Sequence, residues 1–94
     1  MTHMKKVYVS FTSAIPCNYD QDNVPTRVRL TVWARTNAHS FAVITELNEP
    51  YWVGCEQHIY ERARKIKAFA EGVFAENGYV VEGFRRGIKE KGEP

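Results

Sequence analysis

The sequence predicts an α+β domain: an antiparallel β-sheet in the order β-β-β-α-β, with one amphipathic helix packed across one face. Two patterns predict it. The segment Thr26–Arg35 alternates apolar and polar residues without a break, whereas from Trp52 onward the apolar residues recur at spacings of three and four. Alternation with period two indicates a half-buried strand, and the longer period indicates a helix. Because each such element has a single apolar face to bury, the helix must lie on the sheet.

The first strand is expected over Lys6–Ile15. Its apolar face carries Val7, Val9, Phe11 and Ile15, and its polar face carries Tyr8, Ser10 and Thr12. The next ten residues, Pro16–Pro25, contain two prolines, two asparagines and two aspartates. Proline removes a donor from the strand ladder, and Asn and Asp favour local turns, so this segment is predicted to be a loop.

The second and third strands are expected to form an antiparallel hairpin. Thr26–Arg35 is the second strand, and His39–Leu47 is the third, with Phe41, Val43 and Leu47 expected on one face and Ser40, Ala42, Ile44 and Glu46 on the other. The three residues between the strands are too few for any other connection, and Asn37 is expected to supply the unusual backbone angle of the turn.

The helix is expected to begin near Cys55 and to end at Asn77-Gly78. A start at Asn48 with Pro50 in the first turn is the alternative, but Gly54 inside a helix would cost roughly 1 kcal/mol. Gly78 stands where a left-handed C-cap is needed. The expected buried stripe consists of Ile59, Ala63, Ile66, Ala70 and Val73, flanked by Phe69 and Phe74.

A fourth strand is expected over Tyr79–Ile88, followed by a charged, frayed tail over residues 89–94. A β-α-β passage makes this strand parallel to the third one, at either sheet edge or in a partner's sheet.

Ninety-four residues form one domain, residues 1–94, with an ordered core of about residues 5–88. The Tyr51-Trp52 pair between hairpin and helix is expected to close the end of the core, or else to join Trp33 in an aromatic patch.

The composition argues against nucleic-acid-binding, disulfide-rich and membrane-spanning proteins. A net charge of +2 is a smaller imbalance than nucleic-acid-binding proteins usually show, and two cysteines are too few for a disulfide framework. No apolar run is long enough to span a bilayer, and the N-terminal residues are expected to form a strand rather than a signal peptide. The chain is therefore expected to be soluble and cytoplasmic. Its size and order of elements are similar to those of many small proteins, some of phage or mobile-element origin, which implies nothing about function.

The best candidate for a binding site is the polar face of Thr26–Arg35. It carries Arg27, Arg29, Trp33 and Arg35, and Tyr8 of the first strand is expected to extend it. Trp and Arg are the residues enriched at protein interfaces, and the same combination suits phosphates and bases. The alternative is a solvated face whose arginines pair with Glu46 or Asp22 across the sheet.

Two further clusters have ordinary structural explanations. Arg62, Arg64, Lys65 and Lys67 could bind phosphate, but Glu61–Lys65 and Lys67–Glu71 have the spacing of helix-stabilising ion pairs. Cys55 and His58 have the spacing for a thiol and an imidazole on one helix face, which would suit a nucleophilic or metal site. No second metal-binding motif accompanies them among Cys17, His39 and His3, so a buried structural cysteine beside an exposed histidine is the preferred interpretation.

No catalytic, phosphate-binding or calcium-binding motif is present, and Asp20 and Asp22 are explained as turn residues. No cofactor and no metal are expected. The sequence thus favours a non-enzymatic binding module that engages a protein partner or its own copy. Nucleic-acid binding by the same face is the alternative, and a Cys/His enzyme ranks lowest.

Overall fold

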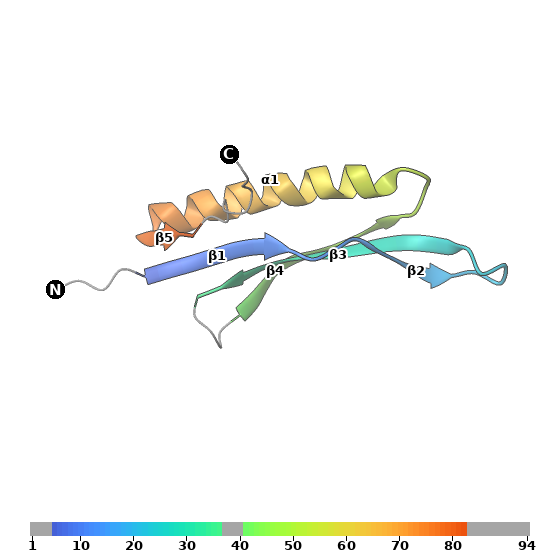
Figure 1. Ribbon diagram of the computed structural model, residues 1–94, viewed down its shortest axis with the longest axis horizontal. Helices are drawn as coiled ribbons and strands as arrows, with labels where there is room; N and C mark the ends of the chain where they lie inside the picture. The colour runs from blue at the N-terminus through green and yellow to red at the C-terminus, as the bar shows by residue number, and fades with distance from the viewer. Residues whose placement is uncertain (1–4, 37–40, 83–94) are drawn as a thin grey trace, which may run out of the picture.

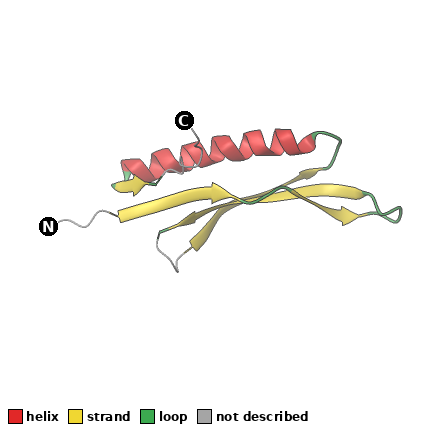
Figure 2. Ribbon diagram, in the orientation of Figure 1, coloured by secondary structure: helices red, strands yellow, loops and turns green. Residues whose placement is uncertain are grey.

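The computed structural model describes residues 5–36 and 41–82. Within these residues, a five-stranded sheet is covered on one side by a single long helix, which confirms the α+β class (Figure 1, Figure 2). The elements are β1 (Lys5–Phe11), β2 (Ile15–Tyr19), β3 (Pro25–Arg35), β4 (Phe41–Pro50), α1 (Cys55–Glu76) and β5 (Tyr79–Val81).

Strand β3 organises the sheet. It pairs antiparallel with β4 along one edge, and with β1 and then β2 along the other edge. β5 pairs in parallel with β1, which places the last strand at the sheet edge away from β4. The predicted hairpin is confirmed in its strand pairing. Asn37, expected in its turn, and residues 83–88 and 89–94, expected as strand and tail, lie outside the described residues.

The predicted loop over Pro16–Pro25 is wrong for half of its length. Residues Ile15–Tyr19 form β2, where Pro16 pairs with Val28, and Pro25 is the first residue of β3. Neither proline interrupts the middle of a ladder. Pro16 lies in an edge strand, which pairs along one side only, and Pro25 is the first residue of its strand. Two residues between them have positive φ angles, Asn18 at 57° and Asn23 at 63°.

A short turn replaces the expected loop. The Asp20 carboxylate oxygen Oδ1 accepts hydrogen bonds from the backbone N–H groups of Asp22 and Val24, at 2.8 and 3.0 Å. This is the local side-chain-to-backbone bonding that makes Asp favourable in turns. The turn explanation of the aspartates therefore holds for Asp20.

The expected first strand is divided in two. β1 ends at Phe11 and β2 begins at Ile15, which pairs with Arg29 on the face away from α1 and is 58% exposed. The prediction that Ile15 shares the face of Val7 and Val9 is therefore wrong. The interruption is fixed by two contacts: the Thr31 N–H donates to Thr12 Oγ1 at 3.0 Å, and the Ala14 N–H donates to the Tyr60 hydroxyl at 2.8 Å.

Replacing Tyr60 with Phe tests whether the helix holds this interruption in place. The ring and its contact with Phe11, at 6.0 Å between centroids, would remain, but the part-buried Ala14 N–H would lose its acceptor. We expect the free energy of unfolding to fall by about 1 kcal/mol. Urea unfolding followed by circular dichroism measures it. Tyr51→Phe is the control, and an equal loss in both variants would contradict the role given to the Tyr60 hydroxyl.

Strand β4 runs from Phe41 to Pro50, later than the expected His39–Leu47, of which residues 39 and 40 lie outside the described range. A register shift interrupts its pairing: Val32 is opposite Thr45, but Trp33 is opposite Val43, so one extra residue of β4 is accommodated there. Such a β-bulge reverses the alternation of the strand. Leu47 therefore faces the core, whereas Phe41 and Val43 lie opposite the outward-facing residues of β3. The prediction that these three share a face is wrong.

The core lies between the sheet and α1. Its fully buried strand residues come from the predicted apolar faces of β1 and β3, namely Val7, Val9, Val28, Leu30 and Val32. From the helix, Ile59, Ala63 and Ala70 are buried, as the stripe predicts, and the two alanines let α1 approach the strands closely. Val73 and Phe69 do not belong to this stripe, because they are 42% and 74% exposed.

Both ends of α1 confirm the predicted boundaries. Gly54 precedes the helix with φ 92°, and Gly78 follows it with φ 90°, so each glycine adopts a backbone conformation that other residues rarely adopt. Between β4 and α1 the two aromatic residues differ. Tyr51 packs against the core as predicted, but Trp52 is exposed, and its ring lies 6.1 Å from that of His58.

Candidate binding surface

The face of the sheet that points away from α1 is called the outer face below. Figure 1 shows α1 lying along the opposite side, and none of the described elements covers the outer face. The alternation of β3 decides which side chains reach it: Val28, Leu30, Val32 and Ala34 are buried, whereas Arg29 and Arg35 are exposed and Arg27 and Trp33 are half-buried. The structure therefore places all four predicted β3 site residues on one surface.

Three rings from three adjacent strands form an aromatic cluster on the outer face. The Trp33 ring of β3 lies 5.7 Å from the ring of Tyr8 in β1, and 5.7 Å from the ring of Phe41 in β4, in tilted arrangements. The pairing register explains this, because Tyr8 and Phe41 both stand opposite Arg35, one diagonal step from Trp33. Tyr8 thus extends the face as predicted, whereas Phe41 was missed.

Arg35 is held against this aromatic cluster. Its guanidinium carbon lies 5.6 Å from the centroid of Tyr8 and 6.0 Å from the centroid of Trp33. A guanidinium near the electron-rich face of a ring is attracted to it, and the arrangement keeps the charge on the surface in a defined position. The structure therefore holds the Arg35 guanidinium and the rings of Tyr8 and Trp33 together on the outer face.

The other two arginines lie toward the opposite end of β3. Arg27 donates from Nε to Asn48 Oδ1 at 2.8 Å, and from Nη2 to the Asn48 carbonyl at 2.9 Å. Arg29 lies between Asn48 and Ile15 on the neighbouring strands. Among residues 5–36 and 41–82, no carboxylate forms an ion pair with Arg27, Arg29 or Arg35. The alternative in which Glu46 or Asp22 neutralises them is not seen there.

Apolar side chains that the sequence pattern assigned elsewhere complete the outer face. Phe41, Val43 and Ile15 are 58–60% exposed. Phe41 and Val43 are outward because of the bulge in β4, and Ile15 because of the break between β1 and β2. One signal for the bulge was present in the sequence: the run Phe41-Ala42-Val43-Ile44 does not alternate.

The structure does not bring Cys55 and His58 together. Cys55, the first residue of α1, is buried, whereas the His58 side chain is 53% exposed. His58 Nε2 lies 4.0 Å from Glu49 Oε1, and the other oxygen of Glu49 accepts a hydrogen bond from Arg62. Glu49 thus links β4 to the first half of α1.

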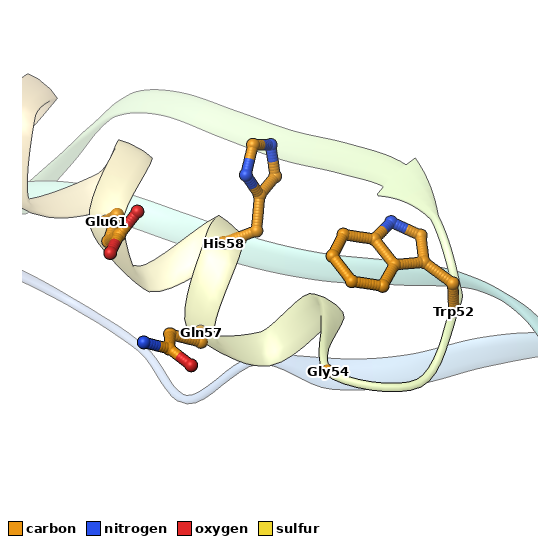
Figure 3. A pocket seen from close by; sticks show the side chains of 5 residues that line it. All are labelled: Trp52, Gly54, Gln57, His58 and Glu61. Carbon is orange, nitrogen blue, oxygen red and sulfur yellow. The ribbon is translucent and has the colours of Figure 1, made fainter.

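His58 also lines a shallow hollow with Trp52, Gly54, Gln57 and Glu61 (Figure 3). In this view the Trp52 ring extends from the loop before α1 toward the helix, and His58 and Gln57 lie on opposite sides of the helix. In the part of the chain that the structure describes, no three His, Cys, Asp or Glu side chains group closely enough to hold a metal ion. His3 and His39 lie outside that part.

The basic residues of α1 agree in part with the ion-pair explanation. Lys67 Nζ lies 2.6 Å from Glu71 Oε2, which confirms that predicted pair, and Arg62 is bound to Glu49. Glu61 and Lys65 form no ion pair within the described residues. Arg64 and Lys65 are exposed around a second shallow hollow, on the side of the molecule opposite the outer face.

In comparisons with known proteins, no family model matches this chain, and no curated protein or solved structure reaches a significant match. Within residues 5–36 and 41–82, no helix combines the length and the apolar composition that crossing a membrane requires. The assignment of a function therefore depends on the geometry of the outer face.

Proposed function

We propose that the chain is a small non-enzymatic binding module that engages a protein partner with its outer face. The binding residues are Tyr8, Arg27, Arg29, Trp33 and Arg35. The observation that carries the proposal is the aromatic cluster with Arg35 held against it, on a sheet face that none of the described elements covers. Large rings and guanidinium groups that stand in fixed positions are the usual anchors of protein interfaces.

The apolar neighbours of the aromatic cluster support a protein partner. Binding would remove the exposed side chains of Phe41, Val43 and Ile15 from water. Their contact with an apolar protein surface would stabilise the complex. Bases stack on rings rather than on aliphatic groups, and Arg35 already lies over the rings of Tyr8 and Trp33. Glu46, opposite Thr31 in the middle of the face, would repel phosphate.

The non-enzymatic character is supported by the separation of the thiol from the imidazole. A nucleophile and its base must lie within hydrogen-bonding reach, and Cys55 is buried while His58 faces solvent. The module as proposed uses no cofactor. Both cysteines are free thiols, which supports a reducing compartment such as the cytoplasm.

Replacing Trp33 with Ala tests the proposal, because it removes the ring at the centre of the aromatic cluster. An interface anchor contributes enough that its loss should weaken partner binding about 30-fold or more. Capture from a cell extract, quantified by mass spectrometry, measures the loss, and light scattering measures any self-association. Circular dichroism should show an intact fold, since the core side of β3 is untouched.

Phe69→Ala is the control, because it removes an aromatic ring that is 74% exposed from α1, away from the outer face. The control should retain every partner that the unmodified protein captures. If the unmodified protein, Trp33→Ala and Phe69→Ala capture the same proteins and have the same mass in solution, the outer face is not the binding surface.

Nucleic-acid binding is the second candidate function, favoured by the absence of ion-pair partners for the three arginines among the described residues. It predicts an affinity that falls steeply with salt as phosphate counterions are released. Fluorescence anisotropy with labelled single- and double-stranded oligonucleotides at two salt concentrations separates the two functions. Absence of binding at low salt would reject this candidate.

A further inference from the structure

The charges of the described strands are distributed unevenly between the two faces of the sheet. On the outer face, the strand positions carry Lys6, Arg27, Arg29 and Arg35, while Glu46 is the one carboxylate among them. Glu49 lies at the helix side, where Arg62 and His58 approach it. The outer face is therefore cationic and apolar, and most acidic groups of the described chain lie elsewhere.

We infer that the partner is an acidic protein segment rather than a second copy of this chain, an inference that depends on the proposed function. A second copy packed face to face would bring three arginines against three arginines. Like charges across an interface are strongly unfavourable, and two copies of Glu46 are too few to compensate six guanidinium groups. A partner that supplies carboxylates meets the same surface without this repulsion.

The spacing of the arginines defines what such a partner presents. Arg29 and Arg35 are six residues apart in β3, which corresponds to about 20 Å along a strand. Trp33 lies between them, and Val43 stands opposite Trp33. The complementary segment carries acidic residues at two points about 20 Å apart, with apolar residues between them. This is about six residues in an extended segment and about thirteen in a helix.

Carboxylates suit this surface because of the geometry of arginine. A guanidinium group donates two parallel hydrogen bonds to one carboxylate, which fixes the orientation of the partner as well as its position. Arg29 is exposed with no ion-pair partner among the described residues, and Arg35 is held in place by the rings of Tyr8 and Trp33. Apolar side chains of the partner would then cover Phe41 and Val43, which are otherwise exposed.

Selection from a random peptide library tests the inference, with three baits of known fold. The baits are the unmodified protein, the outer-face variant Arg29→Glu with Arg35→Glu, and the helix variant Arg64→Glu with Lys65→Glu. Both variants change the net charge equally, and all four residues are exposed. Circular dichroism verifies that each bait is folded.

The unmodified protein and the helix variant are expected to enrich peptides that combine Asp or Glu with apolar residues. The outer-face variant should bind those peptides on the order of 100-fold more weakly, and should itself enrich peptides rich in Lys and Arg. Enrichment of neutral or basic peptides by the unmodified protein, or an equal loss in both charge-reversed variants, would overturn the inference.

Trp33→Ala separates failure of this inference from failure of the proposed function. If neutral peptides are enriched and are lost in Trp33→Ala, the acidic partner is wrong but the outer face still binds protein. The same holds if light scattering shows a dimer that Trp33→Ala dissociates. Peptide binding that is insensitive to Trp33→Ala and to charge reversal in β3, or a labelled oligonucleotide bound through Trp33, would overturn both.

Discussion

Replacing Ile59 with Ala is expected to lower the free energy of unfolding by about 2–5 kcal/mol. The Ile59 side chain has no exposed surface and lies in the core with Leu30 and Val7. Truncation removes the buried atoms and leaves a cavity, and the cost depends on how far the surrounding residues can collapse into it. Because a domain has only about 5–15 kcal/mol of total stability, a loss of this size would leave a large part of the protein unfolded on mild warming.

Urea unfolding monitored by circular dichroism measures the effect, since a chain of this length is expected to unfold in one cooperative step. Val73→Ala is the control, because Val73 lies on the same helix but is 42% exposed. Its effect should remain within about 0.5 kcal/mol. Equal losses at both positions would show that α1 does not pack on the sheet by the face described above.

Replacing Ala63 with Leu is expected to destabilise the protein by about 1–3 kcal/mol, although Leu is a good helix former. Ala63 has no exposed surface and lies where α1 crosses the sheet. A larger side chain there must push the helix away from β1 and β3 or adopt a strained rotamer. The destabilisation measures how closely helix and strands approach each other.

Ala68→Leu provides the matched comparison for Ala63→Leu. Ala68 is exposed beside Arg64 and Lys65, so the same substitution meets only solvent. Thermal unfolding should give a melting temperature for Ala68→Leu close to that of the unmodified protein, and a clearly lower one for Ala63→Leu. A lower melting temperature for both variants would contradict the assignment of the buried face.

Much of this architecture could be predicted from periodicity alone. The alternation in β3 correctly separated its buried residues from its outward residues, because β3 pairs on both edges and packs against a helix on one side. The helix boundaries were correct because Gly54 and Gly78 adopt left-handed backbone conformations that end regular structure. Where a single requirement decides the conformation of a segment, such as burial of one strand face or a positive φ angle, the sequence pattern predicts that conformation.

The errors arose where two constraints compete. Pro16 and the Asn/Asp residues favour a loop, but pairing with β3 makes a strand of Ile15–Tyr19, since an edge strand has one side on which a missing donor costs nothing. In β4, one extra residue reversed the faces, and the non-alternating run Phe41–Ile44 indicates an irregularity there without showing which side chains face outward. On the helix, Val73 fits the three-and-four spacing yet is exposed, and Phe74, four residues after Ala70, packs against the core instead.

The candidate site was foreseen in its arginines and in Trp33, but not in its apolar part. The sequence shows that Trp33 faces away from the helix, because the alternation around it is unbroken. It does not show which side chains of neighbouring strands stand beside Trp33, because pairing register depends on the whole sheet. Phe41 therefore entered the aromatic cluster only when the register of β3 and β4 was known.

Because of the bulge, the two ends of β4 direct apolar side chains to different faces of the sheet. Leu47, on one side of the bulge, is needed for the core, whereas Phe41 and Val43, on the other side, make no contribution to packing under α1. Mutations at the two solvent-facing positions can thus accumulate at little cost to folding. If the outer face binds a partner as proposed, selection for a different partner could change these positions without reducing the stability of the native state.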